Sequence, residues 1–159
     1  MIAGAAPRAG GLTNREVHKA IAAIPDQELP VITIGDLGMI HRVQVSDESI
    51  LVRILPTFVG CPAIELISNA IRDRLAPFGR PVDVGTTFEV PWTSDRISRR
   101  GRRSLEAAGI APPSDPALVR CPWCASARVA MDSAFGPTQC RALYYCRDCR
   151  QPFEALKSV

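Results

Sequence analysis

The sequence predicts an α/β (α+β) protein in which a small mixed sheet with helices packed on it is followed by a separate metal-bound module. Two observations lead to this fold class. Helical apolar spacing alternates with strand-like segments over residues 12–110. After a Pro-rich stretch at 111–117, residues 118–159 contain two Cys-x-x-Cys pairs and few large apolar residues.

Length and composition limit what the chain can be. Its 159 residues suit one medium domain with a small appendage, and a net charge of +3 does not by itself argue for nucleic acid. No apolar run approaches the ~20 residues of a membrane span, and the start lacks the regions of a secretory signal. Five of the six cysteines follow residue 120, and four of these form the paired pattern. This usage favours a reducing, cytoplasmic location without a membrane partner, and we interpret residues 1–11 as a disordered tail.

Helix signals divide the first domain. Thr13 is placed to cap a first helix that ends before Pro25, with Glu16 as its capping-box partner. The clearest helix covers residues 63–75, where isoleucines and a leucine form one stripe. A basic helix is predicted from a cap at Asp95 to about residue 108.

Strand signals lie between these helices. Residues 39–45 and 50–55 flank a polar turn and predict a β-hairpin, and residues 82–90 predict a third strand. Helices interleaved with three strands indicate a small α/β or α+β domain, followed by a separate metal module.

The paired cysteines are the strongest chemical signal. Two such knuckles present four thiolates to one tetrahedral metal ion, and the bound metal supplies folding free energy that this short module lacks. Redox pairs or chance cysteines are the alternative interpretation. We predict a zinc ribbon with a structural zinc ion, whose ligands are Cys121, Cys124, Cys146 and Cys149.

Cys61 stands outside that cluster. Pro62 suits the first helical position, which places Cys61 at or beside a helix N-cap, where the helix dipole favours a thiolate. Gly60 would let a ligand approach closely. The residue types therefore predict a reactive cysteine, and a buried small hydrophobe at a strand–helix junction is the equal alternative.

Acidic side chains occur in loops near the same end of the predicted sheet. Asp26, Glu28 and Asp36 could join a thiolate in holding iron transiently, but turn capping is the favoured interpretation. His18 and His41 show no ligand spacing relative to each other.

Several stretches resemble a known family. Asp26–Pro30, Ile34–Ile40 and Thr57–Pro62 resemble the signature segments of iron–sulfur cluster assembly factors. The continuation through Pro91–Ile97 and the ribbon ending at Phe153 is similar to PaaD-like proteins, the D components of phenylacetyl-CoA oxygenase (ring 1,2-epoxidase) systems.

This resemblance carries functional implications. It implies that Cys61 is the functional thiol, that Thr57 and Pro62 flank it, and that its cargo is iron or an iron–sulfur cluster held transiently. It also implies oxygenase or reductase subunits as partners, with a homodimer as a further assembly. Gln27 stands where the family usually has proline, which loosens the expected turn between the two acids.

No catalytic motif accompanies these features. The sequence has no Glu-x-x-His pair of the di-iron bundle type, no Gly-rich dinucleotide loop and no nucleophile–base pair, which agrees with an accessory component rather than an enzyme. A maturation factor is the leading hypothesis. The alternatives are a structural subunit of the oxygenase complex and, less favoured, a zinc-ribbon nucleic-acid binder.

Two further features stay open. Cys140 could pack near the zinc, replace a ligand or act as an accessory thiol, and a packing role is favoured. Five arginines crowd residues 96–103. A solvated helix face is their default interpretation, followed by docking onto an acidic protein, because the aromatic residues of a nucleic-acid surface are missing.

Overall fold

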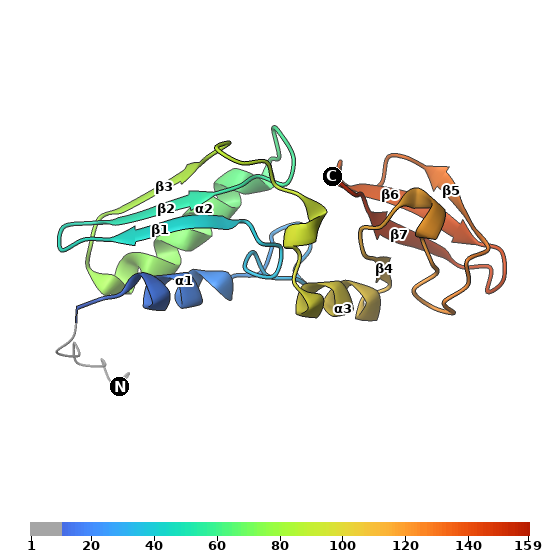
Figure 1. The fold of residues 1–159 in the computed structure, drawn as a ribbon, viewed down its shortest axis with the longest axis horizontal. Coiled ribbons are helices and arrows are strands. Elements are labelled where there is room, and N and C mark those ends of the chain that lie inside the picture. Colours follow the sequence, from blue (N-terminus) through green and yellow to red (C-terminus); the bar gives the residue numbers. More distant parts are fainter. Residues whose placement is uncertain (1–10) are drawn as a thin grey trace.

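A computed structural model describes residues 11–159, which form two small sheets side by side (Figure 1). The prediction of a tail over residues 1–11 lies almost wholly outside the described residues. The mixed α+β architecture with two sheets confirms the predicted fold class.

The first sheet has the order β1-β2-β3. β1 (Ile40–Val45) and β2 (Ile50–Ile54) form the predicted antiparallel hairpin, and β3 (Val82–Thr86) runs parallel to β2. The parallel pair requires a crossover, which α2 (Ala63–Leu75) and the short η1 (Ala76–Phe78) supply. β3 is shorter than the predicted 82–90, because only five residues pair with β2.

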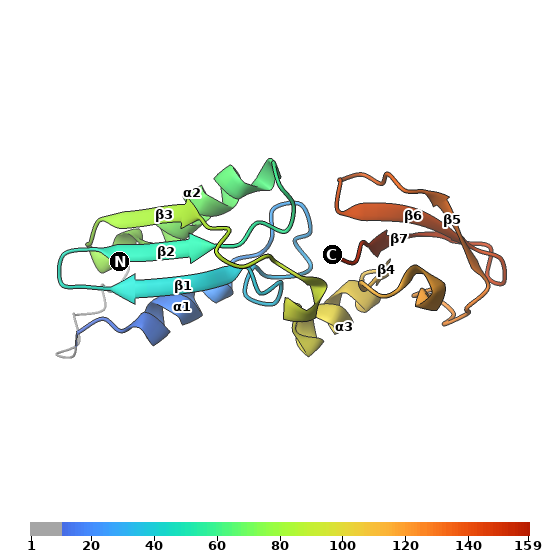
Figure 2. The same cartoon turned by 45° about the horizontal axis from the view of Figure 1, so that its top comes forward.

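Helices cover one face of this sheet (Figures 1 and 2). α1 (Asn14–Ala22) begins at the predicted capping box, in which Thr13 Oγ1 accepts from the Glu16 N–H while the Glu16 carboxylate accepts from the Thr13 N–H. α1 packs on β1 and on α2, and α2 packs on β3. α2 has the predicted bounds, and its stripe of Ile67, Ile71 and Leu75 is buried.

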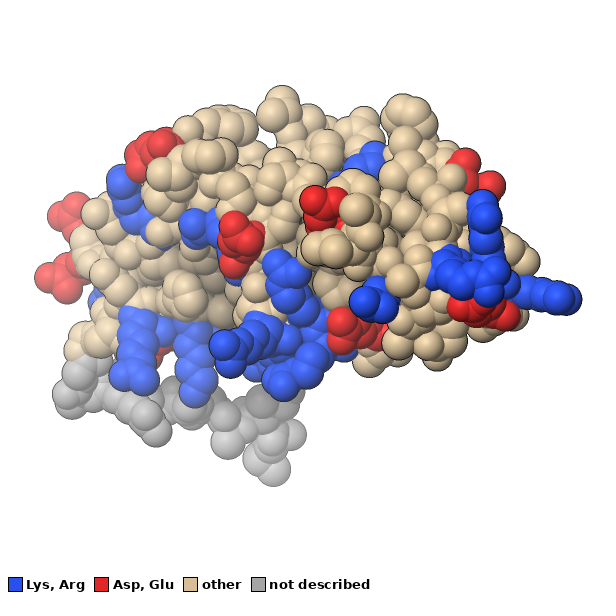
Figure 3. All heavy atoms as spheres, turned by 45° about the vertical axis from the view of Figure 1, so that its right-hand side comes forward, with Lys and Arg blue, Asp and Glu red and all other residues tan. Residues whose placement is uncertain are grey.

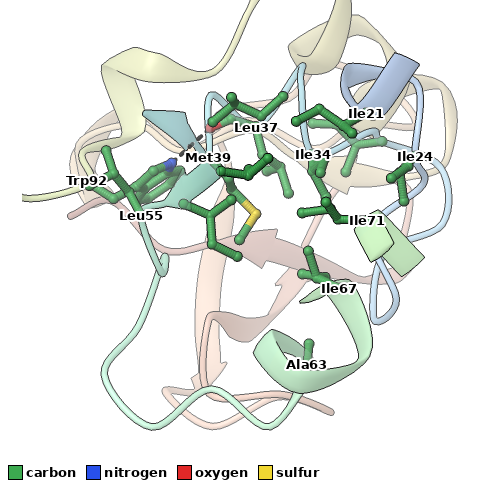
Figure 4. Packing of buried hydrophobic residues seen from close by; sticks show 14 of the residues in the cluster. Ile21, Ile24, Ile34, Leu37, Met39, Leu55, Ala63, Ile67, Ile71 and Trp92 are labelled. Atoms are coloured by element: carbon green, nitrogen blue, oxygen red, sulfur yellow. Dashed lines mark hydrogen bonds between the residues drawn. The ribbon is translucent and has the colours of Figure 1, made fainter. Parts of the chain in front are cut away.

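The core between these helices and the sheet is aliphatic (Figure 4). Ile21, Ile34 and Ile71 have no exposed surface. Trp92 closes one end, where its indole Nε1–H donates to the Leu37 carbonyl at 2.7 Å, so its single polar group is satisfied on burial.

α3 (Arg99–Ala107) follows η2 (Ser94–Arg96) and connects the two sheets. The predicted cap at Asp95 is wrong, because Ser98 caps the helix by accepting from the Gly101 N–H at 2.9 Å. Ile97, Gly101 and Leu105 face inward as predicted.

The second sheet has the order β4-β7-β6-β5. Its strands are β4 (Ile110–Ala111), β5 (Val129–Ser133), β6 (Arg141–Cys146) and β7 (Pro152–Leu156), with η3 (Pro116–Leu118) between β4 and β5. Ala111, which the sequence assigns to a linker, is instead buried in β4, because β4 pairs in parallel with β7.

The two sheets belong to one packed molecule. Ile110 and Leu156 of the second sheet are buried in the same apolar cluster as the first-sheet residues. The C-terminal Val159 exchanges hydrogen bonds with Ser94, whose N–H donates to the Val159 carbonyl at 3.2 Å and whose Oγ accepts from the Val159 N–H at 2.9 Å. We call residues 12–108 the first module and residues 109–157 the ribbon.

None of the helices within residues 11–159 combines the length and apolar character needed to span a bilayer.

Candidate functional site

The four ribbon cysteines converge on one point, as predicted. Their sulfur atoms all lie within 4.8 Å of one another, and the Cys121–Cys149 and Cys124–Cys146 pairs are each 3.6 Å apart. Thiolates at about 2.3 Å from a tetrahedral zinc ion stand roughly 3.8 Å from each other. The donor set and its spacing therefore fit a structural metal site.

Both knuckles have the same backbone geometry. The residue after each second cysteine is left-handed, with φ 60° at Ala125 and 59° at Arg150. The Cys121 N–H donates to the Ser126 carbonyl at 2.9 Å, and the Cys146 N–H donates to the Gln151 carbonyl at 3.0 Å. These turns aim the four sulfurs at one point between the two knuckles.

The surroundings of the four thiols do not all favour deprotonation. Burial opposes ionisation of Cys146, but backbone N–H groups of Cys149 and Asp148 lower its pKa to about 7, whereas burial and the neighbouring thiols raise the pKa of Cys149 to about 12. Arg128 pairs with Asp148 at 2.6 Å and ties the loop before β5 to the second knuckle. A bound cation would further favour the thiolates.

A second thiol-bearing region lies between the first module and the ribbon. In Figure 2 the loop before α2 faces the turn between β5 and β6. An outer cavity of about 300 Å³ and an inner one of about 30 Å³ occupy this junction. Both cavities are lined by Glu28, Thr57, Phe58, Cys61 and Cys140.

Cys61 is reachable in this junction. Pro62 is the N-cap of α2, so Cys61 lies immediately before the helix, and its side chain is only partly buried. Gly60 has φ 75° with open space around it, so the loop turns there without obstructing the thiol. Cys61 thus lines an open cavity while it also packs against the core of the first module, as the alternative of a small hydrophobe at this junction expects.

The electrostatic surroundings of Cys61 oppose the predicted thiolate. Burial raises the pKa of the Cys61 thiol, the Ala63 N–H lowers it, and the carboxylates of Glu28 and Asp26 raise it again. Desolvation and the two negative charges raise the Cys61 pKa by more than the N-terminal end of the helix lowers it. These surroundings therefore favour the thiol form of Cys61 over the thiolate that the helix end favours.

The acidic residues separate into two places. Glu28 lines both cavities and Asp26 lines the inner one, where its Oδ1 also accepts from the N–H groups of Glu28 and Leu29 at 3.0 and 2.8 Å. Turn capping is thus confirmed for Asp26, and Gln27 does not disrupt it, since its side chain donates to the Pro25 carbonyl.

Asp36 does not join this site. Its carboxylate accepts from Ser98 Oγ at 2.6 Å and from Arg100 Nε at 3.0 Å, and its backbone carbonyl accepts from the Ser98 N–H. Asp36 therefore anchors the start of α3, away from the thiols.

Cys140 lies at the junction rather than in the ribbon cluster. It packs against the core of the first module, and the metal-competent group found among residues 11–159 does not include it. Its sulfur lies 3.1 Å from Thr138 Oγ1. The favoured packing role therefore agrees with this contact, although Cys140 packs against the first module and not beside the ribbon cysteines.

Sequence reasoning missed the residues of that turn. Phe135, Pro137 and Thr138 line the outer cavity together with Cys61. Gly136-Pro137 signals a turn, but no local pattern indicates that it faces a loop more than seventy positions earlier in the chain.

The arginines of residues 96–103 serve mainly as structural contacts. Arg96 Nε donates to the Gly38 carbonyl at 2.8 Å, Arg100 pairs with Asp36, and Arg102 donates to the Pro113 and Ser94 carbonyls. Lys and Arg side chains nevertheless gather low on the face drawn in Figure 3, near the position of α3 in Figure 1.

The fold and the four-cysteine cluster define a class: an iron–sulfur cluster assembly domain followed by a zinc β-ribbon. The iron–sulfur cluster assembly protein model matches residues 14–84, and the PaaD zinc beta ribbon domain model matches residues 109–157. The chain is 40% identical over 152 residues to the D component of the putative 1,2-phenylacetyl-CoA epoxidase of Escherichia coli, covering 91% of this chain and 92% of that protein. The chain belongs to the family of phenylacetyl-CoA epoxidase D components, the PaaD family.

Solved structures agree on the fold of the first module. A domain of unknown function (DUF59) from Bacillus anthracis matches with TM-score 0.53 and 22% identity, over 58% of this chain and 90% of that one. A conserved hypothetical protein from Thermotoga maritima matches with TM-score 0.50 and 26% identity, over 59% and 94%.

Proposed function

We propose that the chain is a non-catalytic maturation factor for the iron or iron–sulfur centres of a multicomponent phenylacetyl-CoA oxygenase in the cytoplasm. The observation that carries this proposal is the open junction cavity, in which the Cys61 thiol and the Glu28 carboxylate both lie. A thiol beside a carboxylate offers ligands to a thiophilic metal ion, and the opening lets cargo enter and leave.

The environment of Cys61 suits temporary binding. Its raised pKa means that iron must displace a proton to bind, which weakens retention and makes release by reprotonation easier. The family match to an iron–sulfur assembly domain supports iron as the cargo.

The ribbon has a different part in this proposal. Its four thiolates hold a structural zinc ion, and the ribbon walls one side of the cavity and docks the oxygenase or reductase subunits. The relative's name as an epoxidase component supports these partners.

The test replaces Cys61 by Ser in cells that express the whole oxygenase system. We expect the purified oxygenase and reductase to contain less iron and to epoxidise phenylacetyl-CoA correspondingly more slowly. Val59→Ser is the matched control, because Val59 lies on the same loop, is 82% exposed and lines neither junction cavity. Iron content and activity equal to those of the control would refute the maturation role.

A structural subunit is the second candidate, favoured because the relative is named as part of the epoxidase itself. In that case Cys61→Ser leaves oxygenase activity unchanged, and the chain co-purifies in fixed proportion with the oxygenase. Cys124→Ser, which removes a metal ligand, would then dissociate the complex.

A further inference from the structure

We propose that Cys61 and Cys140, one from each module, form a single two-thiol iron site with the Glu28 carboxylate as a third ligand. This inference rests on the proposed function, which it deepens by naming the ligands. The two sulfurs line the same outer and inner cavities, although seventy-eight residues separate them between positions 61 and 140.

The backbone holds Cys140 firmly at this position. The Cys140 carbonyl accepts from the Lys157 N–H at 2.8 Å, which fixes the start of β6 to the end of β7. Lys157 Nζ also donates to the Gln139 carbonyl at 2.8 Å and lies 5.3 Å from the centre of the Phe135 ring. The turn that presents Cys140 is therefore tied down at several points.

Cys61 is fixed from the other side. Its N–H donates to the Phe58 carbonyl at 3.3 Å, and its own carbonyl accepts from the Ile64 N–H at 3.2 Å at the start of α2. Glu28 belongs to a turn that the Asp26 carboxylate caps. Three separately anchored segments thus place Cys61, Cys140 and Glu28 on the wall of one cavity. Within residues 11–159 only the ribbon sulfurs already lie at mutual ligand distance, so binding of the ion requires these three side chains to turn toward one another.

This ligand set selects a thiophilic cation. Two thiolates and a carboxylate together carry three negative charges, which suits iron and disfavours an anionic or neutral ligand. Binding is balanced by proton release: one Fe²⁺ ion forms two Fe–S bonds and two thiol protons pass to solvent, with no change in oxidation state.

Three protein ligands leave the coordination sphere incomplete. Structural zinc sites are closed by four protein ligands, as in the ribbon, whereas sites that exchange ligands keep an open position. The outer cavity of about 300 Å³ has room for that exchange and for the sulfide of a small cluster. The arrangement suits transfer, and it explains why the ribbon is fused to the first module: the ribbon supplies the second thiol.

The experiment uses the full chain with zinc in the ribbon, kept free of oxygen and titrated with Co²⁺ alone. Thiolate-to-cobalt charge-transfer absorption grows with the number of thiolate ligands. We expect one Co²⁺ per chain beyond the zinc, with half the charge-transfer intensity in Cys140→Ser and in Cys61→Ser. Each substitution should also weaken binding by about tenfold or more, because loss of a supporting group alone costs that much.

Controls separate folding from ligation. Val59→Ser should bind as the unaltered chain does, and zinc content together with the unfolding midpoint shows whether each variant keeps its fold. Repeating the titration with Fe²⁺, with and without sulfide, and measuring acid-labile sulfide distinguishes a single ion from a cluster.

The outcomes are distinguishable. If Cys140→Ser binds Co²⁺ as the unaltered chain does while Cys61→Ser does not, the two-thiol site is refuted and the proposed function stands. If neither substitution alters Co²⁺ binding, the site is likewise refuted. If the titration gives the expected result but Cys61→Ser leaves oxygenase iron unchanged in cells, the maturation role fails while the metal site stands.

Discussion

At the residue scale, Cys61 combines access to solvent with resistance to ionisation. Cys61 lines an open cavity, yet burial and the nearby carboxylates of Glu28 and Asp26 raise the pKa of its thiol. The same carboxylates would stabilise a cation bound to the sulfur. The negative charges of Glu28 and Asp26 therefore make Cys61 a weaker nucleophile, but they favour binding of a metal cation to its sulfur.

Glu28→Gln should make Cys61 more reactive in the metal-free protein. Removing one negative charge lowers the thiol pKa, so a larger fraction is ionised at about pH 8, where iodoacetamide reacts with the thiolate. We expect alkylation of Cys61, followed by mass spectrometry, to accelerate about two- to fivefold, the effect of about 0.5–1 kcal/mol of lost repulsion.

Glu48→Gln is the matched control, because Glu48 lies in the exposed β1–β2 turn and changes net charge equally. Equal alkylation rates in Glu28→Gln and the unaltered chain would show that the Glu28 charge does not act on Cys61.

At the element scale, the turn that follows the C-terminal end of α3 packs closely against the first Cys-x-x-Cys knuckle, residues 121–124. Gly109 ends α3 with φ 78°, and a Cβ added there would lie 2.2 Å from the ring of Trp123. Trp123 stands between Cys121 and Cys124. This glycine therefore permits both a left-handed turn and the close approach of the knuckle.

Gly109→Ala should destabilise the protein by about 2 kcal/mol, of which about 1 kcal/mol comes from the left-handed backbone and the rest from displacing Trp123. Gly79→Ala isolates the backbone part, since Gly79 has φ 67° with nothing within 4 Å of an added Cβ. Urea unfolding measures both. If the two variants lose equal stability, the contact with Trp123 contributes nothing.

Asp36 fixes α3 at its other end. We expect Asp36→Asn to cost about 2 kcal/mol, because hydrogen bonds of a charged group to Ser98 and Arg100 are lost. Burial opposes the charge, but these partners lower the Asp36 pKa below 3.8. The stabilisation is therefore present above that value and is lost as the pH falls through the lower folded pKa.

Urea unfolding at several pH values should show this dependence in the unaltered chain and its loss in Asp36→Asn, with the exposed Asp47→Asn as control. A steep loss of stability in acid that persists in Asp36→Asn would assign the acid sensitivity to other groups.

Local signals predict what depends on local structure. The Thr13 capping box, the bounds of α2 and the clustering of the four paired ribbon cysteines follow from spacing in the sequence, and the structure has each of them. Ser98, and not the predicted Asp95, caps α3, because its hydroxyl donates a hydrogen bond to Asp36, which lies far away in the sequence. The position of Cys140 in the same cavities as Cys61 likewise depends on packing between modules, which no local pattern encodes.

At the scale of the whole molecule, the ribbon is both a metal-bound module and one wall of the junction site. Leu156 and Ile110 are buried against the first module, and the C-terminal residues bond to Ser94. The core of the first module is mostly its own, with α1 and α2 packed on β1 and β3. The metal in the ribbon should therefore be required for the ribbon to form its wall of the junction cavity, but not for the β1–β3 sheet to stay folded.

Removal of the ribbon metal by a chelator should unfold the ribbon while β1–β3 persist. The zinc-bound state supplies roughly 10 kcal/mol or more of folding free energy in such modules, so the β4–β7 sheet should not survive its loss. Hydrogen exchange should rise in β5, β6 and β7 but not in β2 or α2.

After metal removal, Cys140 should alkylate at the rate of a free thiol. Cys61 should alkylate faster than in the intact protein, because the ribbon wall that buries both thiols is no longer folded. Readdition of zinc should reverse every change. Uniform exchange across both sheets would mean instead that the modules fold as one cooperative unit, and unchanged alkylation of Cys140 would show that its turn stays docked without the metal.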